Sequence, residues 1–178
     1  MALAEIFETV IAEAPTPLTD IPAYANQDYL AGRIQVLFGV DIHAELRECM
    51  KPDSKLNVNL DQAMSSFQQD DPVNGYQLIV ISIENYEPDY ADCYGITDDM
   101  DSTLDALTEY WTLFYPNLTQ ETEDTCFANY MANEWIISGY ETQMVTSWYA
   151  GHYFNAGQYM GLIGDILNTG LETEAVIA

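Results

Sequence analysis

The choice between a helical and a sheet protein rests on residues 70–86, which read DDPVNGYQLIVISIENY. An aspartate just before a helix accepts hydrogen bonds from the free amides of the first turn, and proline is preset for the first helical position. Asp71 and Pro72 therefore indicate a helix start. The apolar residues 78–81 would also suit a short buried strand, but the cap and the length of the segment favour a helix over residues 72–86.

The segments on both sides repeat apolar residues at spacings of three and four, which is the period of an amphipathic helix. Gly39, Gly139 and Gly170 mark expected helix ends, as does Pro116, which cannot continue a helix. With short joints between the segments, the pattern predicts one all-α bundle of six or seven helices. Helical periodicity covers residues 27–38, 41–50, 56–67, 72–86, 101–115, 119–137, 141–149 and 153–168.

The first 26 residues are expected to form a partly extended N-terminal arm, because Pro15, Pro17 and Pro22 exclude a continuous helix. Its apolar residues are too many for an idle tail, so we expect the arm to dock on a neighbour. The bundle domain is expected over residues 27–170, and residues 171–178 form a C-terminal tail. The apolar residues of the arm are Ile6, Phe7, Val10 and Ile11.

Composition and charge exclude several classes of function. The chain has 178 residues, of which 48% are hydrophobic, and its 13 Tyr and 3 Trp provide the surface of a real core. Its formal net charge is −25, from 29 acidic and 4 basic residues. We therefore expect no binding to nucleic acid and no attraction to an anionic membrane surface, because both depend on Lys and Arg. The expected basic patch comprises Arg33, Arg47, Lys51 and Lys55.

The sequence also bears on export. No apolar run approaches the roughly 20 residues that cross a bilayer, so we expect no membrane insertion. The first residues carry acids where a secretory leader has a basic start. We expect either that the protein is not exported or that the numbering begins after a leader was removed. In the second case its location would be extracellular or a secretory granule.

Clusters of acidic residues are the first candidates for a cation site, because calcium prefers several oxygen ligands in one loop. Residues 99–105 imitate the start of an EF-hand, but Leu104 replaces the required glycine and Tyr110 the bidentate glutamate. The EF-hand interpretation fails, and we expect no cofactor beyond weakly bound calcium. The weak metal candidates are Asp98, Asp99, Asp101 and Asp105.

No pattern indicates a catalytic site. The two histidines are His43 and His152, and His43 lies nearly two helical turns before Cys49, which disfavours a Cys–His pair. Nothing selects one pair among the many carboxylates for acid–base chemistry. No glycine-rich phosphate loop follows a strand, so nucleotide binding has no support. We predict no catalytic residues.

Two further motifs concern packing and modification. Gly157, Gly161 and Gly164 lie within the last predicted helix, where they indicate close packing of another helix. Asn117 begins an Asn-Leu-Thr triplet, the acceptor sequence for N-glycosylation, which matters only if the chain is exported.

The chain has three cysteines, Cys49, Cys93 and Cys126, and no CxxC pair or zinc signature. Their number allows one disulfide with one remaining thiol in an oxidising compartment. Buried free thiols are the alternative, and the count alone leaves both open.

Three parts of the chain also form a pattern of Gly, Cys and aliphatic residues. They are residues 37–42 leading to Cys49, residues 74–76 with an apolar helix leading to Cys93, and residues 148–157 followed by Gly161 and residues 166–167. Over roughly residues 37–167 the chain resembles a widespread group of helical, cysteine-containing secreted proteins of ciliates and related protists.

The resemblance implies secretion and a disulfide between Cys49 and Cys93, and the group has no assigned enzymatic activity. Such a bridge would close a loop of about 45 residues and contribute roughly 3 to 4 kcal/mol in the chain-entropy model. Cys126 departs from the pattern of the group.

We therefore expect a non-enzymatic structural subunit of an exported assembly, such as a fibre, matrix or coat. Copies of the chain, or other secreted subunits, would join through the arm and the charge-segregated surface. One alternative is a soluble calcium-binding granule-matrix protein that condenses when cations neutralise its acids. Another is an acidic DNA mimic that inhibits a nucleic-acid enzyme. An enzyme is the least supported interpretation.

Overall fold

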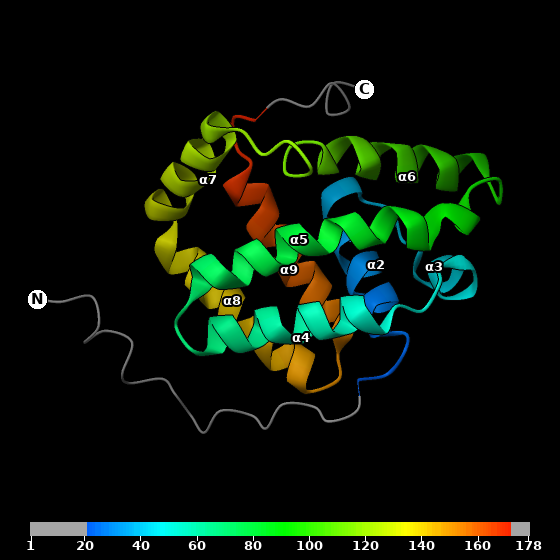
Figure 1. The fold of residues 1–178 in the computed structure, drawn as a ribbon, viewed down its shortest axis with the longest axis horizontal. Helices are drawn as coiled ribbons and strands as arrows, with labels where there is room; N and C mark the ends of the chain where they lie inside the picture. The colour runs from blue at the N-terminus through cyan, green and yellow to red at the C-terminus, as the bar shows by residue number, and fades with distance from the viewer. Residues whose placement is uncertain (1–20, 172–178) are drawn as a thin grey trace, which may run out of the picture.

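The structure, a computed structural model, describes residues 21–171 of the chain. This part forms eight α-helices and one short 3-10 helix and contains no strand, which confirms the all-α prediction with one helix more than expected (Figure 1). The helices are α2 (Ala25–Phe38), α3 (His43–Cys49), α4 (Ser54–Gln68), α5 (Pro72–Tyr90), η1 (Ala91–Cys93), α6 (Asp98–Trp111), α7 (Gln120–Ala132), α8 (Glu134–Tyr149) and α9 (Tyr153–Leu167).

The apolar segment that could have been a strand forms helix α5. The Asp71 carboxylate accepts a hydrogen bond from the Asn74 amide at 3.1 Å, and Pro72 occupies the first turn, as predicted. The helix runs four residues beyond the predicted end and includes Pro88 in its last turn. A proline there cannot donate to the Glu84 carbonyl, so the last turn lacks one hydrogen bond, and the helix ends two residues later.

Other predicted boundaries were also wrong, and α6 ends at Trp111 although its end was expected at Pro116. The break between α7 and α8 lies at Asn133, whose side-chain amide donates to the Asn129 carbonyl at 2.9 Å, and not at Gly139. Gly139 lies inside α8, where a helix tolerates glycine at a modest cost. Helix α6 begins at Asp98 and not at Asp101, because the Thr97 hydroxyl caps it by accepting from the Met100 amide.

Helices α2 and α9 cross at the centre of the bundle, behind α4 and α5 in Figure 1. Their backbones touch through glycine: a Cβ on Gly157 would overlap the carbonyl of Tyr29, and a Cβ on Gly32 would overlap the carbonyl of Phe154. On Gly161 it would lie 2.7 Å from the side chain of Val36. The interpretation of the glycines in the last helix as a packing face is confirmed.

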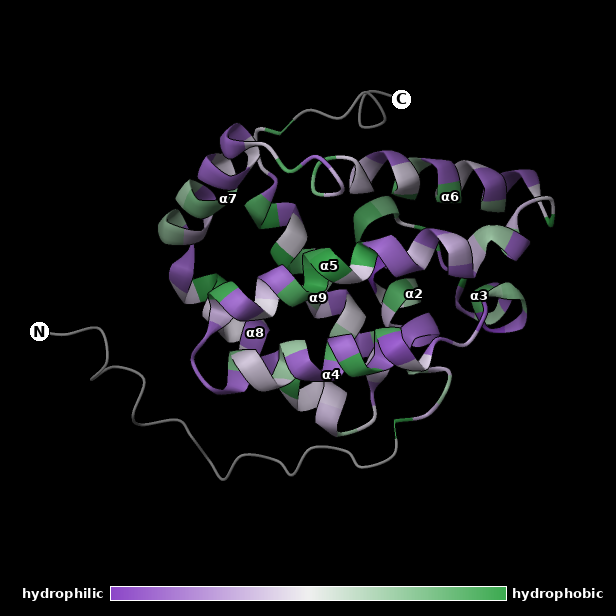
Figure 2. Ribbon diagram, in the orientation of Figure 1, coloured by the Kyte–Doolittle hydropathy of each residue, from purple (hydrophilic) through white to green (hydrophobic). Residues whose placement is uncertain are grey.

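The remaining helices cover this central pair. Helix α4 packs on α5 and α8, and α8 packs on α9. The aromatic rings of Tyr86 and Trp111 stack at 5.7 Å and connect α5 to α6. In Figure 2 hydrophilic and hydrophobic residues alternate along α4 and α6, as expected for helices with one face in solvent. Large side chains fill the interior, among them Trp148, Tyr29 and Tyr90.

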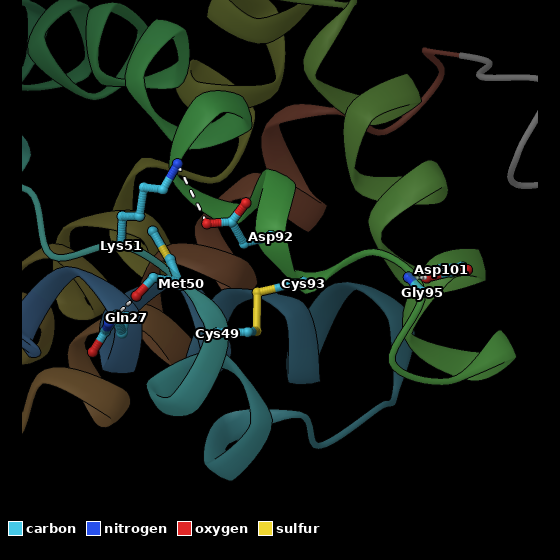
Figure 3. The surroundings of a disulfide bond; sticks show 8 residues. All are labelled: Gln27, Cys49, Met50, Lys51, Asp92, Cys93, Gly95 and Asp101. Carbon is cyan, nitrogen blue, oxygen red and sulfur yellow. Dashed lines mark hydrogen bonds and ion pairs between the residues drawn. A yellow bond between two sulfur atoms is a disulfide. The ribbon is translucent and has the colours of Figure 1, made fainter.

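A disulfide joins Cys49, the last residue of α3, to Cys93 in η1 (Figure 3). It links positions 44 residues apart in sequence, a separation that contributes about 4 kcal/mol in the chain-entropy model. The pairing implied by the resemblance is therefore present. Nearby, Lys51 pairs with Asp92 at 3.3 Å, and the Gln27 side chain donates to the Met50 carbonyl at 2.6 Å (Figure 3).

Two further predictions concern the N-terminal arm and the membrane. The arm residues Ile6, Phe7, Val10 and Ile11 lie outside the described residues. Within residues 21–171, every helix is too short or too polar to cross a membrane.

Candidate functional site

A cavity of about 630 Å³ lies between helices α5, α7 and α9. Its walls are largely apolar because each helix turns one apolar stripe inward, with residues at spacings of three and four. Figure 1 shows α5 at the centre, α7 at the upper left and α9 behind them. The apolar wall residues include Ile79, Val80, Ile83, Tyr130, Met160 and Leu167.

The cavity runs from buried residues to exposed ones. Ile79, Ile83 and Met160 are buried, whereas Val73 and Phe127 are each 67% exposed. In the described part of the chain the cavity therefore opens to solvent across an apolar rim. Four of the polar residues in its lining are exposed: Gln77, Gln120, Glu123 and Asp124.

Arg33, from the middle of α2, lines the cavity although it is only 3% exposed. Its guanidinium lies 4.7 Å from the ring centre of Trp111 and 6.0 Å from that of Tyr29. Its Nε and Nη1 atoms have no hydrogen-bond partner, and it forms no ion pair with any acid of the described residues. Buried charges in proteins are normally paired, so this arrangement is unusual.

Neutral polar groups surround the same guanidinium. The hydroxyl of Tyr29 is buried without a hydrogen-bond partner among the described residues, and the buried hydroxyls of Tyr86 and Tyr110 lie close to Arg33. Burial raises the pKa of Tyr29 to about 12 and raises the pKa of Tyr86 and Tyr110, although the nearby Arg33 charge opposes each increase. These tyrosines remain neutral, so none of them is a counter-ion for Arg33.

A short chain of hydrogen bonds orients one hydroxyl of the lining. The Cys126 thiol donates to the Asn168 side-chain carbonyl at 3.7 Å, and the Asn168 amide donates to the Tyr110 oxygen at 2.5 Å. All three residues line the cavity. Because the Tyr110 oxygen accepts from Asn168, its own proton is free for another acceptor. Burial raises the pKa of the Cys126 thiol, which keeps it protonated.

A partly buried carboxyl lies behind the cavity wall. The hydroxyl of Tyr76, a wall residue, donates to the Glu141 carboxylate at 2.6 Å. Burial raises the pKa of Glu141 to about 7, although the Tyr76 hydrogen bond opposes the increase. Glu141 does not line the cavity itself, so its charge state affects the wall only through Tyr76.

The four basic residues do not form one exposed patch. Arg33 is buried, so the prediction was wrong for this residue. Arg47 binds the Asp28 carboxylate through two hydrogen bonds of 2.6 Å. Lys51 lies 3.3 Å from Asp92, and Lys55 lies 3.8 Å from Glu84.

The predicted metal candidates lie in the first turns of α6. Asp98, Asp99 and Asp101 face the amino end of this helix, where negative charge complements the helix dipole, and Asp105 lies one turn further on. The Asp101 carboxylate accepts from the Gly95 amide at 2.7 Å (Figure 3). Over residues 21–171, no group of three or more His, Cys, Asp or Glu side chains is arranged to hold a metal ion.

The other candidate residues also have clear positions. Asn117 is exposed and adjoins Leu118, a residue of the cavity lining. His43 lies 2.7 Å from Asp28 and stacks on Phe154. Cys49 is in the disulfide, so it is not a thiol paired with His43.

Sequence reasoning missed the cavity, although one signal was available. Arg33 interrupts the apolar stripe of α2, because Leu30 and Leu37 flank it at helical spacings of three and four. A basic residue at such a position must be paired in the core or directed to a site. It was instead grouped with three surface cations because they are close in sequence.

The fold and the site together define an all-α protein with an open apolar cavity, lined by one buried cation. Comparison of the chain with protein-family models, curated proteins and solved structures finds no match. Its function is therefore argued from the geometry of the site.

Proposed function

We propose that this protein is a non-catalytic carrier that binds one apolar small molecule in the cavity between α5, α7 and α9. The observation that carries the proposal is the cavity of about 630 Å³ with largely apolar walls. Small-molecule sites have volumes of roughly 300 to 1,000 Å³ and mostly hydrophobic linings with a few polar groups.

The exposed side chains at the rim also support uptake of a ligand. Val73, Ile81, Leu118 and Phe127 all belong to the lining and are all exposed. Exposed apolar side chains at a rim are unfavourable in water unless another apolar group covers them. Such patches commonly mark binding sites. The two histidines and the Glu141 carboxyl do not line the cavity, which is consistent with binding without catalysis.

Binding of a non-ionic solvatochromic dye to the full chain tests this proposal. We expect one dye per chain with the emission shift of an apolar site. Replacement Val80→Trp places a large ring in the cavity wall and should weaken binding by about tenfold or more. Val58→Trp is the matched control, because Val58 is exposed on α4 and lies outside the lining.

A dye that does not bind the full chain, or one that binds both variants equally, would remove the carrier proposal. Circular dichroism of both variants shows whether each retains its helices, so a loss of binding through unfolding is recognised directly.

We also propose assembly, the function expected from the sequence, as a second candidate. Phe127 and Met131 lie one turn apart in α7 and are 67% and 51% exposed, and Trp135, near the start of α8, is 90% exposed. Large apolar side chains in solvent favour contact with another protein. The Cys49–Cys93 disulfide supports an oxidising, extracellular compartment for such an assembly.

The net charge of −25 sets the condition for assembly, because two copies repel each other unless counter-ions screen them. Light scattering after size-exclusion chromatography should therefore detect oligomers in about 1 M NaCl and monomers at low salt. Trp135→Glu should abolish the oligomers, whereas Val58→Glu, which adds the same charge elsewhere, should not. A monomer at every salt concentration would rule out self-assembly through Phe127, Met131 and Trp135.

A further inference from the structure

We infer that Arg33 receives the headgroup of the bound molecule, so the ligand class is an alkyl chain ending in one carboxylate. This inference rests on the proposed carrier function and adds the chemistry of the ligand to it. The starting observation is a guanidinium in the lining that is 3% exposed and forms no ion pair with an acid of the described residues.

The geometry around Arg33 suits a carboxylate. A guanidinium presents a planar fork of N–H donors, which matches the two oxygens of a carboxylate in a bidentate pair. The Tyr110 hydroxyl also lines the cavity, and its proton is free because its oxygen accepts from Asn168. The neutral groups of Tyr29 and Trp111 flank the guanidinium without supplying negative charge.

The charge distribution of the chain strengthens this assignment. The protein has 29 acidic residues, and the other three cations each lie beside one of them, yet none of the described acids pairs with Arg33. A buried unpaired charge is unfavourable, and a carboxylate brought into the cavity would offset that cost. The pair would be strong because water is largely excluded there.

The positions of buried and exposed lining residues give the ligand a direction. Arg33 is buried, as are Ile79 and Met160 of the lining, whereas Phe127 and Val73 are exposed at the rim. The carboxylate would therefore enter first and the end of the alkyl chain would lie near the rim. The opposite polarity, an alkylamine with its cation at the rim beside Glu123 and Asp124, is the competing arrangement.

Displacement of the non-ionic dye by dodecanoate, dodecanol and dodecylamine distinguishes these arrangements in the full chain. The three probes share one alkyl chain and differ in the headgroup. We expect dodecanoate to bind at least about tenfold more tightly than dodecanol, and dodecylamine to bind more weakly than both. In Arg33→Met the preference for the acid over the alcohol should disappear.

Two further variants complete the test. Arg47→Met removes the same charge from an arginine outside the lining and should preserve the preference for the acid. Tyr110→Phe keeps the ring and removes one donor, so it should weaken dodecanoate binding by about tenfold and leave dodecanol unchanged. If Arg33→Met does not fold, two measurements still test the assignment of Arg33. They are the comparison of the three probes on the unmodified chain and the binding of the probes to Tyr110→Phe.

The two proposals fail in different ways. If the dye and dodecanol bind but dodecanoate has no advantage, or if dodecylamine binds most tightly, the assignment of Arg33 is overturned and the carrier function stands. If neither the dye nor any of the probes binds, the carrier function itself fails.

Discussion

Arg33 lies against the faces of Trp111 and Tyr29, and no carboxylate of residues 21–171 pairs with it. Replacement of a buried charge by an apolar side chain of similar length is often neutral or stabilising. We therefore expect Arg33→Met to leave the free energy of unfolding unchanged or to raise it by up to about 2 kcal/mol. Urea denaturation followed by circular dichroism measures this change.

Arg47→Met provides the contrast at the same scale. Asp28 is 8% exposed and accepts two hydrogen bonds from Arg47, so removal of the guanidinium leaves a buried carboxylate with His43 as its remaining partner. The expected loss is about 2 kcal/mol or more. An equal or greater loss in Arg33→Met would mean that the contacts of Arg33 with aromatic rings stabilise the fold.

Glu141 gives the folded protein a dependence on pH. Burial raises its pKa from an ordinary 4.5 to about 7, so the folded state binds more protons than the unfolded state between these values. Stability should therefore be highest below about pH 4.5, fall as the pH rises to about 7 and then level off, by about 3 kcal/mol at most. Denaturation midpoints measured from pH 4 to pH 8 record this decrease.

Glu141→Gln should remove the part of this decrease that Glu141 causes, because an amide keeps a similar shape and does not ionise. The part from Asp89, whose pKa burial raises to about 6, should remain. Glu87→Gln is the matched control, since Glu87 is exposed on the same helix as Tyr76 and its removal changes the net charge equally. An unchanged pH dependence in Glu141→Gln would assign it to other acids.

At the scale of the elements, the pairing of α2 with α9 depends on glycine. A Cβ on Gly157 would overlap the carbonyl of Tyr29, so the helices would have to separate. We expect Gly157→Ala to lower the free energy of unfolding by about 3 kcal/mol or more. Gly139→Ala should raise it by up to about 1 kcal/mol, because Gly139 lies in a helix with open space around it.

Thermal denaturation of the two glycine variants gives the comparison directly. The substitution is chemically the same in both, and only the tertiary surroundings differ. Similar stability of Gly157→Ala and the unmodified chain would show that α2 and α9 do not approach as closely as described.

At the scale of the whole molecule, charge repulsion is the main unfavourable term that solvent can change. With a net charge of −25, added salt should raise the unfolding temperature by screening the acids from one another. Each kcal/mol of repulsion removed corresponds to about 2 to 4 °C for a chain of this size. Scanning calorimetry between about 10 mM and 500 mM NaCl measures the effect.

Choline chloride at the same ionic strength should give the same increase if the effect is only screening. A clearly greater increase with calcium chloride at matched ionic strength would contradict that explanation. It would instead support the alternative of a calcium-binding protein.

Local chemistry explains which parts of the fold could be predicted. The Asp71–Pro72 start and the glycine that ends α2 act within one helical turn, so neighbouring residues specify them. The break near Asn133 was misplaced at Gly139, because the cost of a glycine inside a helix is small enough for tertiary packing to override. The count of cysteines left the disulfide open, and its pairing was predicted only from the resemblance to the protist proteins.

The sequence by itself determined the helical class and the strongly acidic net charge, because periodicity and charge are properties of neighbouring or summed residues. Only the tertiary structure decided that Arg33 lies in a cavity and not in a surface patch. The cavity brings residues of α2, α5, α7 and α9 together, and the gap between them depends on how closely α2 meets α9. Such long-range distances follow from the packing of the whole core, which no local pattern encodes.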